Sequence, residues 1–292
     1  MEGLAPIDGW ALLAILAKAI GYAAALIAMG GPLFLAVFRS APPDVRRIAR
    51  KLAVIAALIG LAVLALRFGI RAARISGMGL SGATDTMMLG FVWDSPLGTA
   101  ALWRGAGELL IVAVLIEGTI GMTASLLGAL LIAMSYAFVG HSLGDPRWIL
   151  AGLLVTHLLA AAFWVGSLAP LHRAAAKGEN AALLHRFGTI ASGTVAILVI
   201  VGVSFAWLMI GSPTGLFGTA YGWTLIIKIA VVTGLLGLAA RNKLRLVPAL
   251  ASGAPSASAR LRRSIRMEII IVALILLATA TLTSITTPPV NL

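Results

Sequence analysis

Eight long hydrophobic runs, separated by short polar links, dominate the pattern of this chain. A helix needs about 20 apolar residues to cross the hydrocarbon core of a bilayer, and each run reaches that length. The runs are continuous rather than alternating, which favours helices over the strands of a barrel. The sequence therefore predicts an all-α, polytopic membrane bundle with helices over residues 10–38, 48–72, 97–116, 118–140, 148–171, 187–211, 221–240 and 265–286.

Composition strengthens this interpretation. The mean hydropathy is +1.04, 60% of the 292 residues are hydrophobic and only 11% are charged, which is far more apolar than a soluble domain of this length. Eight helices leave no room for a large soluble domain, so we expect a single transmembrane domain over residues 1–292. The first apolar run is too long for a cleaved signal peptide and is assigned as the first span.

The positions of the basic residues predict the orientation. Three links, within residues 39–51, 173–186 and 241–266, hold 15 of the 22 Lys and Arg residues. The N-terminal tail, the link between the sixth and seventh runs and the C-terminal tail hold none. By the positive-inside rule the three basic links are cytoplasmic and both termini are periplasmic. The net charge of +12 is thus explained by orientation and anionic lipid, and no nucleic-acid partner is expected.

Several chemistries have no counterpart in the sequence. It contains no cysteine, which excludes disulfides, thiolate metal sites and cysteine nucleophiles. It has no Walker loop, no dinucleotide-binding loop and no nucleophile–histidine–acid spacing. We therefore expect that the protein is not an enzyme, and that a soft metal such as copper would be bound by Met and His.

Two histidines are the strongest candidates for a metal site. His157 lies nine residues beyond Trp148 in the fifth run, roughly 13 Å into the core, where an ionisable group indicates function by default. A neutral histidine that bonds a neighbouring helix is the alternative. His141 follows the fourth run in a turn at the outer surface, and its alternative is a solvated interfacial histidine. The depth difference predicts two successive stations rather than one site.

A second candidate site lies in the long Gly-rich outer link between the second and third runs. Thioethers are soft ligands suited to Cu(I), and carboxylates suit Cu(II), although Met is also an ordinary apolar filler. This candidate site comprises Met78, Met87, Met88 and Asp85, with Met209 near the outer end of the sixth run.

Charged residues inside the runs form a third candidate group. Arg104 and Glu108 are four residues apart and share a helical face, and Lys228 lies roughly 10 Å deep in the seventh run. A Glu108–Lys228 pair would compensate two costly charges; it would serve either as a structural ion pair or as part of a proton relay. Glu117 and Glu268 are interpreted as interfacial.

The second half of the chain resembles the copper resistance protein D (CopD) family. The resemblance rests on GHSLGD, THLLAAAFWVGSLAPL, YGWTLIIKIAVVTGLLGLAARNKLRLVPAL and the last run with its terminal PP, and is strongest over residues 140–289. It implies a bacterial inner-membrane protein of about eight helices that handles copper, and a separate periplasmic copper carrier of the CopC type as partner. His141 and His157 fall on the family's histidine positions, and Lys228, Asn242 and Glu268 on its other polar positions.

Three functions follow as hypotheses. The first is copper transport from periplasm to cytoplasm, as Cu(I) or Cu(II), through weak His and Met sites that exchange ligands. The second is a haem-binding electron-transfer protein, in which His157 and His141 would hold one haem. The third is a membrane docking partner for the periplasmic carrier that transports nothing.

Overall fold

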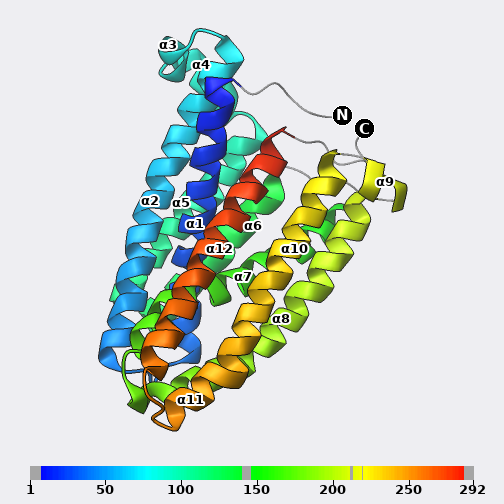
Figure 1. Ribbon diagram of the computed structural model, residues 1–292. Helices are drawn as coiled ribbons and strands as arrows, with labels where there is room; N and C mark the ends of the chain where they lie inside the picture. Colours follow the sequence, from blue (N-terminus) through cyan, green and yellow to red (C-terminus); the bar gives the residue numbers. More distant parts are fainter. Residues whose placement is uncertain (1–7, 140–145, 211–212, 219, 286–292) are drawn as a thin grey trace.

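The computed structural model describes residues 8–139, 146–210, 213–218 and 220–285, and the described residues are almost entirely helical. Within them eight helical segments are long and apolar enough to cross a membrane, as predicted. In Figure 1 they run side by side, and α1 begins at the same end of the bundle at which α12 ends. The protein is therefore a polytopic helical membrane bundle.

The first half of the chain comprises seven helical elements and two 3₁₀ turns that extend them. These are α1 (Gly9–Val37), α2 (Pro43–Ser76), α3 (Leu80–Ala83), α4 (Thr86–Trp93), α5 (Pro96–Ile111) with η1 (Val112–Leu115), α6 (Thr119–Ser135) with η2 (Tyr136–Phe138), and α7 (Arg147–Ala174). Local signals set the helix ends. Asp8 caps α1 by accepting from the Ala11 N–H at 2.6 Å, and α2 ends at Gly77 with φ of 68°, which favours glycine.

The second half contains three long helices joined by shorter elements. These are η4 (Gly178–Asn180), α8 (Ala181–Ile210), α9 (Pro213–Gly218), α10 (Ala220–Arg241), the π turn η5 (Asn242–Leu246), α11 (Val247–Ala251) and α12 (Ala257–Ile285). Helix α12 begins eight residues earlier than its apolar run predicts, and its first turns carry the arginines. Hydropathy locates the part of a helix inside the bilayer but not its polar extension.

Helix α1 lies at the centre of the bundle, in contact with α2, α5, α6, α7 and α12. Its closest approach is to α7, where Gly30 faces Gly166. A Cβ atom on Gly30 would overlap the Ala162 carbonyl oxygen and the Gly166 Cα atom. Small residues let two membrane helices gain van der Waals contact where no hydrophobic driving force acts, so this pair fixes α7, and with it His157, against α1.

Helices α8 and α10 are much less covered by the rest of the protein than α1 to α7. Large apolar side chains face outward along both helices, including Ile200, Val203 and Trp207 on α8 and Ile227 on α10. Helix α8 packs on α7, and α10 packs on α12. These outward faces match a lipid environment.

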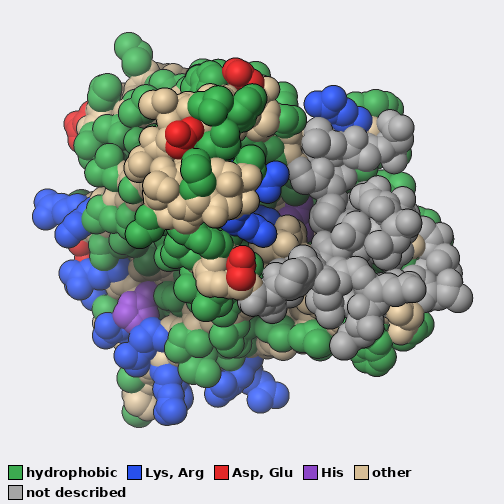
Figure 2. Space-filling view, turned by 90° about the horizontal axis from the view of Figure 1, so that it is seen from above, with side chains coloured by type: hydrophobic (Ala, Val, Ile, Leu, Met, Phe, Trp, Pro, Cys, Tyr) green, Lys and Arg blue, Asp and Glu red, His purple; other side chains and the backbone are tan. Residues whose placement is uncertain are grey.

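The two ends of the bundle differ in charge. One end, here called the basic end, holds the α1–α2, α7–α8 and α11–α12 links, with Arg39, Arg173 and Lys177 beside or within them. The opposite end carries α3 and α4. Viewed from that end, Figure 2 shows a few acidic side chains among apolar ones, and Lys and Arg side chains beside a histidine near the centre of the face.

Candidate functional site

The outer link between α2 and α5 contains two short helices. Asp85 caps α4, accepting a hydrogen bond from the Met88 N–H at 2.9 Å, so a structural role already accounts for one carboxylate oxygen. Met87 is 63% exposed and Met78 is also exposed, while Met88 is half-buried. The methionine site thus stays a prediction, with thioethers presented on the surface of the α3–α4 end.

Two predicted ligands cannot be placed. His141 lies outside the described residues, and the side chain of Met209 is likewise not described, although its backbone belongs to α8. In the described part of the chain, no group of three or more His, Asp or Glu side chains is arranged to hold a metal ion. A copper site built from described residues therefore has to use few ligands or other donor types.

Glu108 is the most buried carboxyl group of the N-terminal helices, with an exposed fraction of 1%. It lies against Gly60 of α2, where a Cβ atom would overlap the carboxyl group. Arg104 lies close enough to interact electrostatically with the Glu108 carboxyl group. No ion pair joins them within the described ranges, however, and Glu108 Oε2 has no hydrogen-bond partner there.

The expected Glu108–Lys228 pair is not formed in the described part of the chain. Lys228 instead lies near His157, so close that its positive charge interacts electrostatically with the imidazole ring. The prediction failed because depth along a helix says nothing about which face of the bundle a side chain occupies. Lys228 and His157 lie on α10 and α7, whereas Glu108 lies on α5, between α2 and α6.

A cluster of cations, here called the cationic cluster, occupies the half of the bundle nearer the α3–α4 end. It comprises Lys18, Arg67 and Arg104. Lys18 Nζ donates to the Thr283 carbonyl oxygen at 2.8 Å, and Arg67 lies close to both other cations. The Arg104 guanidinium stacks 3.8 Å from the Tyr136 ring centroid and donates to Ser135 Oγ at 3.2 Å. Positive charge in a medium of low dielectric constant repels a metal cation.

A second polar cluster lies where α7, η5 and α12 meet, and it is here called the Glu268 cluster. It comprises Trp164, Asn242, Ser264 and Glu268. Asn242 Nδ2 donates to Glu268 Oε1, and the Trp164 indole is a further hydrogen-bond partner of that carboxyl group. Glu268 is 4% exposed. Its carboxyl group is therefore enclosed by protein, and its position at the depth of the membrane interface stays a prediction.

The Glu268 cluster has unused hydrogen-bonding capacity. Asn242 Oδ1 and Ser264 Oγ are both buried and have no partner among the described residues. Ser264 lies four residues before Glu268, on the same face of α12. Buried polar atoms without partners are costly and call for an explanation, such as an ion that binds there. Carboxyl, amide and hydroxyl oxygens are thus all present among the buried side chains of this cluster.

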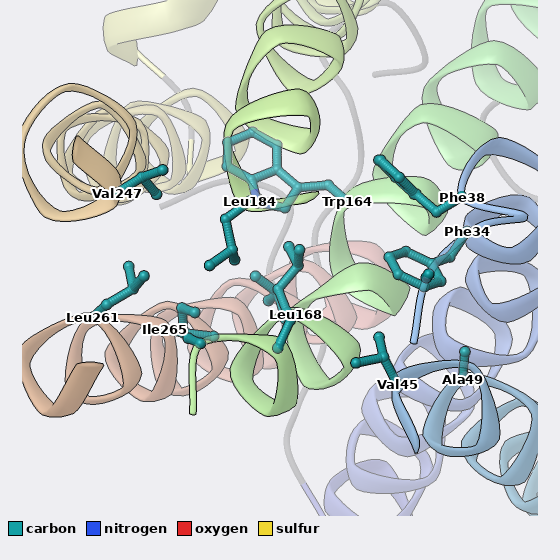
Figure 3. Packing of buried hydrophobic residues seen from close by; sticks show 14 of the residues in the cluster. Phe34, Phe38, Val45, Ala49, Trp164, Leu168, Leu184, Val247, Leu261 and Ile265 are labelled. Carbon is teal, nitrogen blue, oxygen red and sulfur yellow. The ribbon is translucent and has the colours of Figure 1, made fainter. Parts of the chain in front are cut away.

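Local structure explains how Asn242 reaches Glu268. Asn242 is the first residue of η5, a π turn that interrupts the helical register between α10 and α11, and such turns are frequent at functional sites. Apolar side chains enclose Trp164. Figure 3 shows it beside Leu184, with Leu261 and Ile265 of α12 in the same core. This packing excludes water from one side of the cluster.

His157 and the Glu268 cluster lie at successive depths along the same helix, because Trp164 of that cluster and His157 both belong to α7. They are seven residues apart on α7, so they share a helical face and differ in depth by roughly 10 Å. His157 is half-buried. The order from the α3–α4 end to the basic end is His157 with Lys228 nearby, then Trp164 and the Glu268 cluster. Further on lie His172, in the last turn of α7, and the exposed His185.

The fold and these buried polar groups define a multi-pass membrane protein with ionisable side chains along its interior. The family model described as "Copper resistance protein D-like, N-terminal domain" matches residues 7–148, and that described as "Copper resistance protein D" matches residues 181–282. No curated protein and no solved structure matches the chain. The chain belongs to the copper resistance protein D family and is a copper-handling membrane protein.

The family matches refine the resemblance seen in the sequence. They confirm the family and extend it to the first half of the chain, where the resemblance was weaker. Asn242 and Glu268 lie inside the C-terminal match, whereas His157 lies between the two matched ranges. The family supports copper over haem.

Proposed function

We propose that this protein carries copper across the bacterial inner membrane, from the periplasm to the cytoplasm, along the seam between α7, α10 and α12. His157 is the first intramembrane station and the Glu268 cluster is the second. The observation that carries the proposal is the buried Glu268 carboxyl group with two further oxygen atoms, Asn242 Oδ1 and Ser264 Oγ, that lack partners in the described chain.

The donor set suits weak, transient binding. A neutral imidazole followed by carboxyl, amide and hydroxyl oxygens offers N and O ligands of the kind that Cu(II) accepts. Neither station is a closed cage of four protein ligands, and an incomplete site lets an ion leave as well as enter. Cu(I) would rely more on His157 and on the surface methionines.

Charge supports the choice of seam. The cationic cluster lies among α1, α2, α5 and α12, where it repels a copper ion and closes the N-terminal half of the bundle to it. The buried carboxyl group of that half, Glu108, lies beside Arg104, whereas the Glu268 carboxyl group has Asn242 and Trp164 as its partners. Lys228 beside His157 opposes cation entry there, and it keeps occupancy of His157 weak.

The driving force follows from the orientation. With the basic end in the cytoplasm, a membrane potential that is negative inside contributes about 2.3 kcal/mol per elementary charge for every 100 mV. This pull acts inward on Cu(I) or Cu(II) and needs no nucleotide. A periplasmic carrier of the CopC type would deliver copper at the α3–α4 end, where methionines are exposed.

The test is copper content in cells that express the protein. Cells producing the wild-type chain should accumulate several-fold more copper than cells carrying an empty vector, as measured by mass spectrometry of washed cells. Equal copper content at verified expression would reject transport. In that case retention of a CopC-type carrier on membranes would favour a docking role.

A further inference from the structure

A groove runs between α10 and α12 on the lipid-facing side of the bundle. Its lining residues are apolar or small except at one end: Val231, Gly234, Leu238 and Arg241 from α10, and Arg263, Met267 and Ile271 from α12. The two helices are antiparallel, so both arginines lie together at the basic end of the groove, and Val231 and Ile271 lie together at the other.

The dimensions of the groove match one leaflet of a bilayer. Ten residues separate Val231 from Arg241, which corresponds to roughly 15 Å along a helix. The hydrocarbon core is about 30 Å thick, so the groove begins at the basic surface and ends near the midplane. Its apolar wall follows the depth that an acyl chain occupies in that leaflet.

The two arginines at the groove end are available to a ligand. Both are exposed, and neither has a hydrogen bond or an ion pair within the residues that the structure describes. Two other basic residues at this end are engaged: Arg173 pairs with Asp44 at 2.9 Å, and Lys243 Nζ donates to Ser192 Oγ at 2.7 Å. A phosphate group is the anion that a pair of guanidinium groups recognises best.

We infer that this groove binds an anionic phospholipid. Its phosphate pairs with Arg241 and Arg263, and an acyl chain lies along Gly234, Leu238, Met267 and Ile271. Basic pockets between membrane helices on the cytoplasmic side are typical sites for such lipids. This inference goes beyond copper transport, because it concerns the outer surface of α10 and α12 and not the buried seam.

The site adjoins the Glu268 cluster in sequence on both helices. Arg241 precedes Asn242, and Met267 precedes Glu268. A bound lipid therefore contacts both of the helices next to the hydrogen bond between Asn242 and Glu268. Loss of the lipid would loosen this contact, although the lipid itself binds no copper.

The test is native mass spectrometry of the detergent-purified protein, titrated with palmitoyl-oleoyl phosphatidylglycerol or with phosphatidylcholine of the same chains. The wild type should bind one phosphatidylglycerol in clear preference to phosphatidylcholine. Arg241→Gln with Arg263→Gln should weaken that binding by about 30-fold, because each basic residue contributes roughly fivefold. The matched control is Arg245→Gln with Arg260→Gln, which removes the same charge nearby and should change binding little.

A second variant tests the groove without altering charge. A Cβ atom on Gly234 meets no neighbour within 4 Å, and the same holds for Gly237, which does not line the groove. Gly234→Phe should therefore fill the groove and abolish the bound lipid, whereas Gly237→Phe should retain it. Equal loss in both arginine pairs, or retention in Gly234→Phe, would overturn the proposal. So would a dimer that forms without lipid and is lost in Gly234→Phe, since a second copy would then occupy the groove.

Discussion

Asn242 and Glu268, which are 26 residues apart in the chain, are joined by a buried hydrogen bond from the amide Nδ2 atom to the carboxyl Oε1 atom. The bond links the π turn after α10 to the middle of α12. It leaves Asn242 Oδ1 without a partner in the described chain, and Ser264 Oγ, which belongs to the residue four positions before Glu268 on α12, likewise has none. A purely structural contact would satisfy all its members, so these unpartnered atoms support the proposed copper station.

Removing the amide should cost stability. Asn242→Leu leaves the Glu268 carboxyl group without its Asn242 donor, and an unsatisfied buried partner costs about 1–3 kcal/mol. We expect a lower Tm in a fluorescence-detected thermal unfolding assay in detergent. Leu244→Ala on the same π turn is the control, because Leu244 is exposed and should change the Tm little. An unchanged Tm in Asn242→Leu would mean that the hydrogen bond contributes nothing to the fold.

His157→Ala should lower copper accumulation in cells without lowering the amount of protein in the membrane. Loss of an outer-shell partner alone reduces metal affinity by about 10- to 100-fold, so loss of a ligand should reduce accumulation at least as strongly at limiting copper. His185→Ala is the matched control, because His185 is exposed on α8. Wild-type accumulation in the His157 variant would leave this residue with a packing role only.

The helices could be predicted from the sequence, because the thickness of the bilayer sets the length of each apolar run. The residues at which the helices begin and end could not be predicted as accurately from the sequence. The polar starts of α2 and α12 are helical although their arginines end the apolar pattern, and capping by Asp85 creates α4 within a link that composition marks as a loop.

The site was harder to predict for a geometric reason. The sequence gives the depth of a residue in its helix, which identified His157 as intramembrane. It does not give the neighbours of that residue, and for this reason it predicts a Glu108–Lys228 ion pair that the described residues do not form. The resemblance to the family marked Asn242 and Glu268 as polar positions, and that was the available signal for the Glu268 cluster.

Replacing Met78, Met87 and Met88 together with Leu should weaken copper binding at the α3–α4 end. Leu keeps the volume and the helix propensity of Met but removes the thioether, so α4 should persist. Equilibrium titration of purified protein with Cu(I) and a competing chelator measures the affinity. Met122→Leu, a partly buried position, is the control. An affinity equal to that of the wild type would show that these methionines are ordinary surface residues.

Reporter fusions test the orientation on which the direction of transport depends. A reporter placed after residue 178 should be active in the cytoplasm, and one placed after residue 285 should be active in the periplasm, because the positive-inside rule predicts that the basic links are cytoplasmic. Alkaline phosphatase and green fluorescent protein give opposite readouts at each position. Activity on the same side for both fusions would contradict the three spans, formed by α8, α10 and α12, that lie between the two fusion points.

The central claim is that Glu268 takes part in copper passage, and copper uptake into proteoliposomes by the Glu268→Gln variant tests it most directly. Gln keeps the size of the side chain and an oxygen that accepts from Asn242, but it removes the acidic group. With an imposed inside-negative potential, we expect the variant to fold with a wild-type Tm and to take up copper at least about tenfold more slowly. Glu117→Gln, at an exposed carboxylate that pairs with Arg50 at 3.6 Å, should transport like the wild type. Uptake by Glu268→Gln at the wild-type rate would contradict the account.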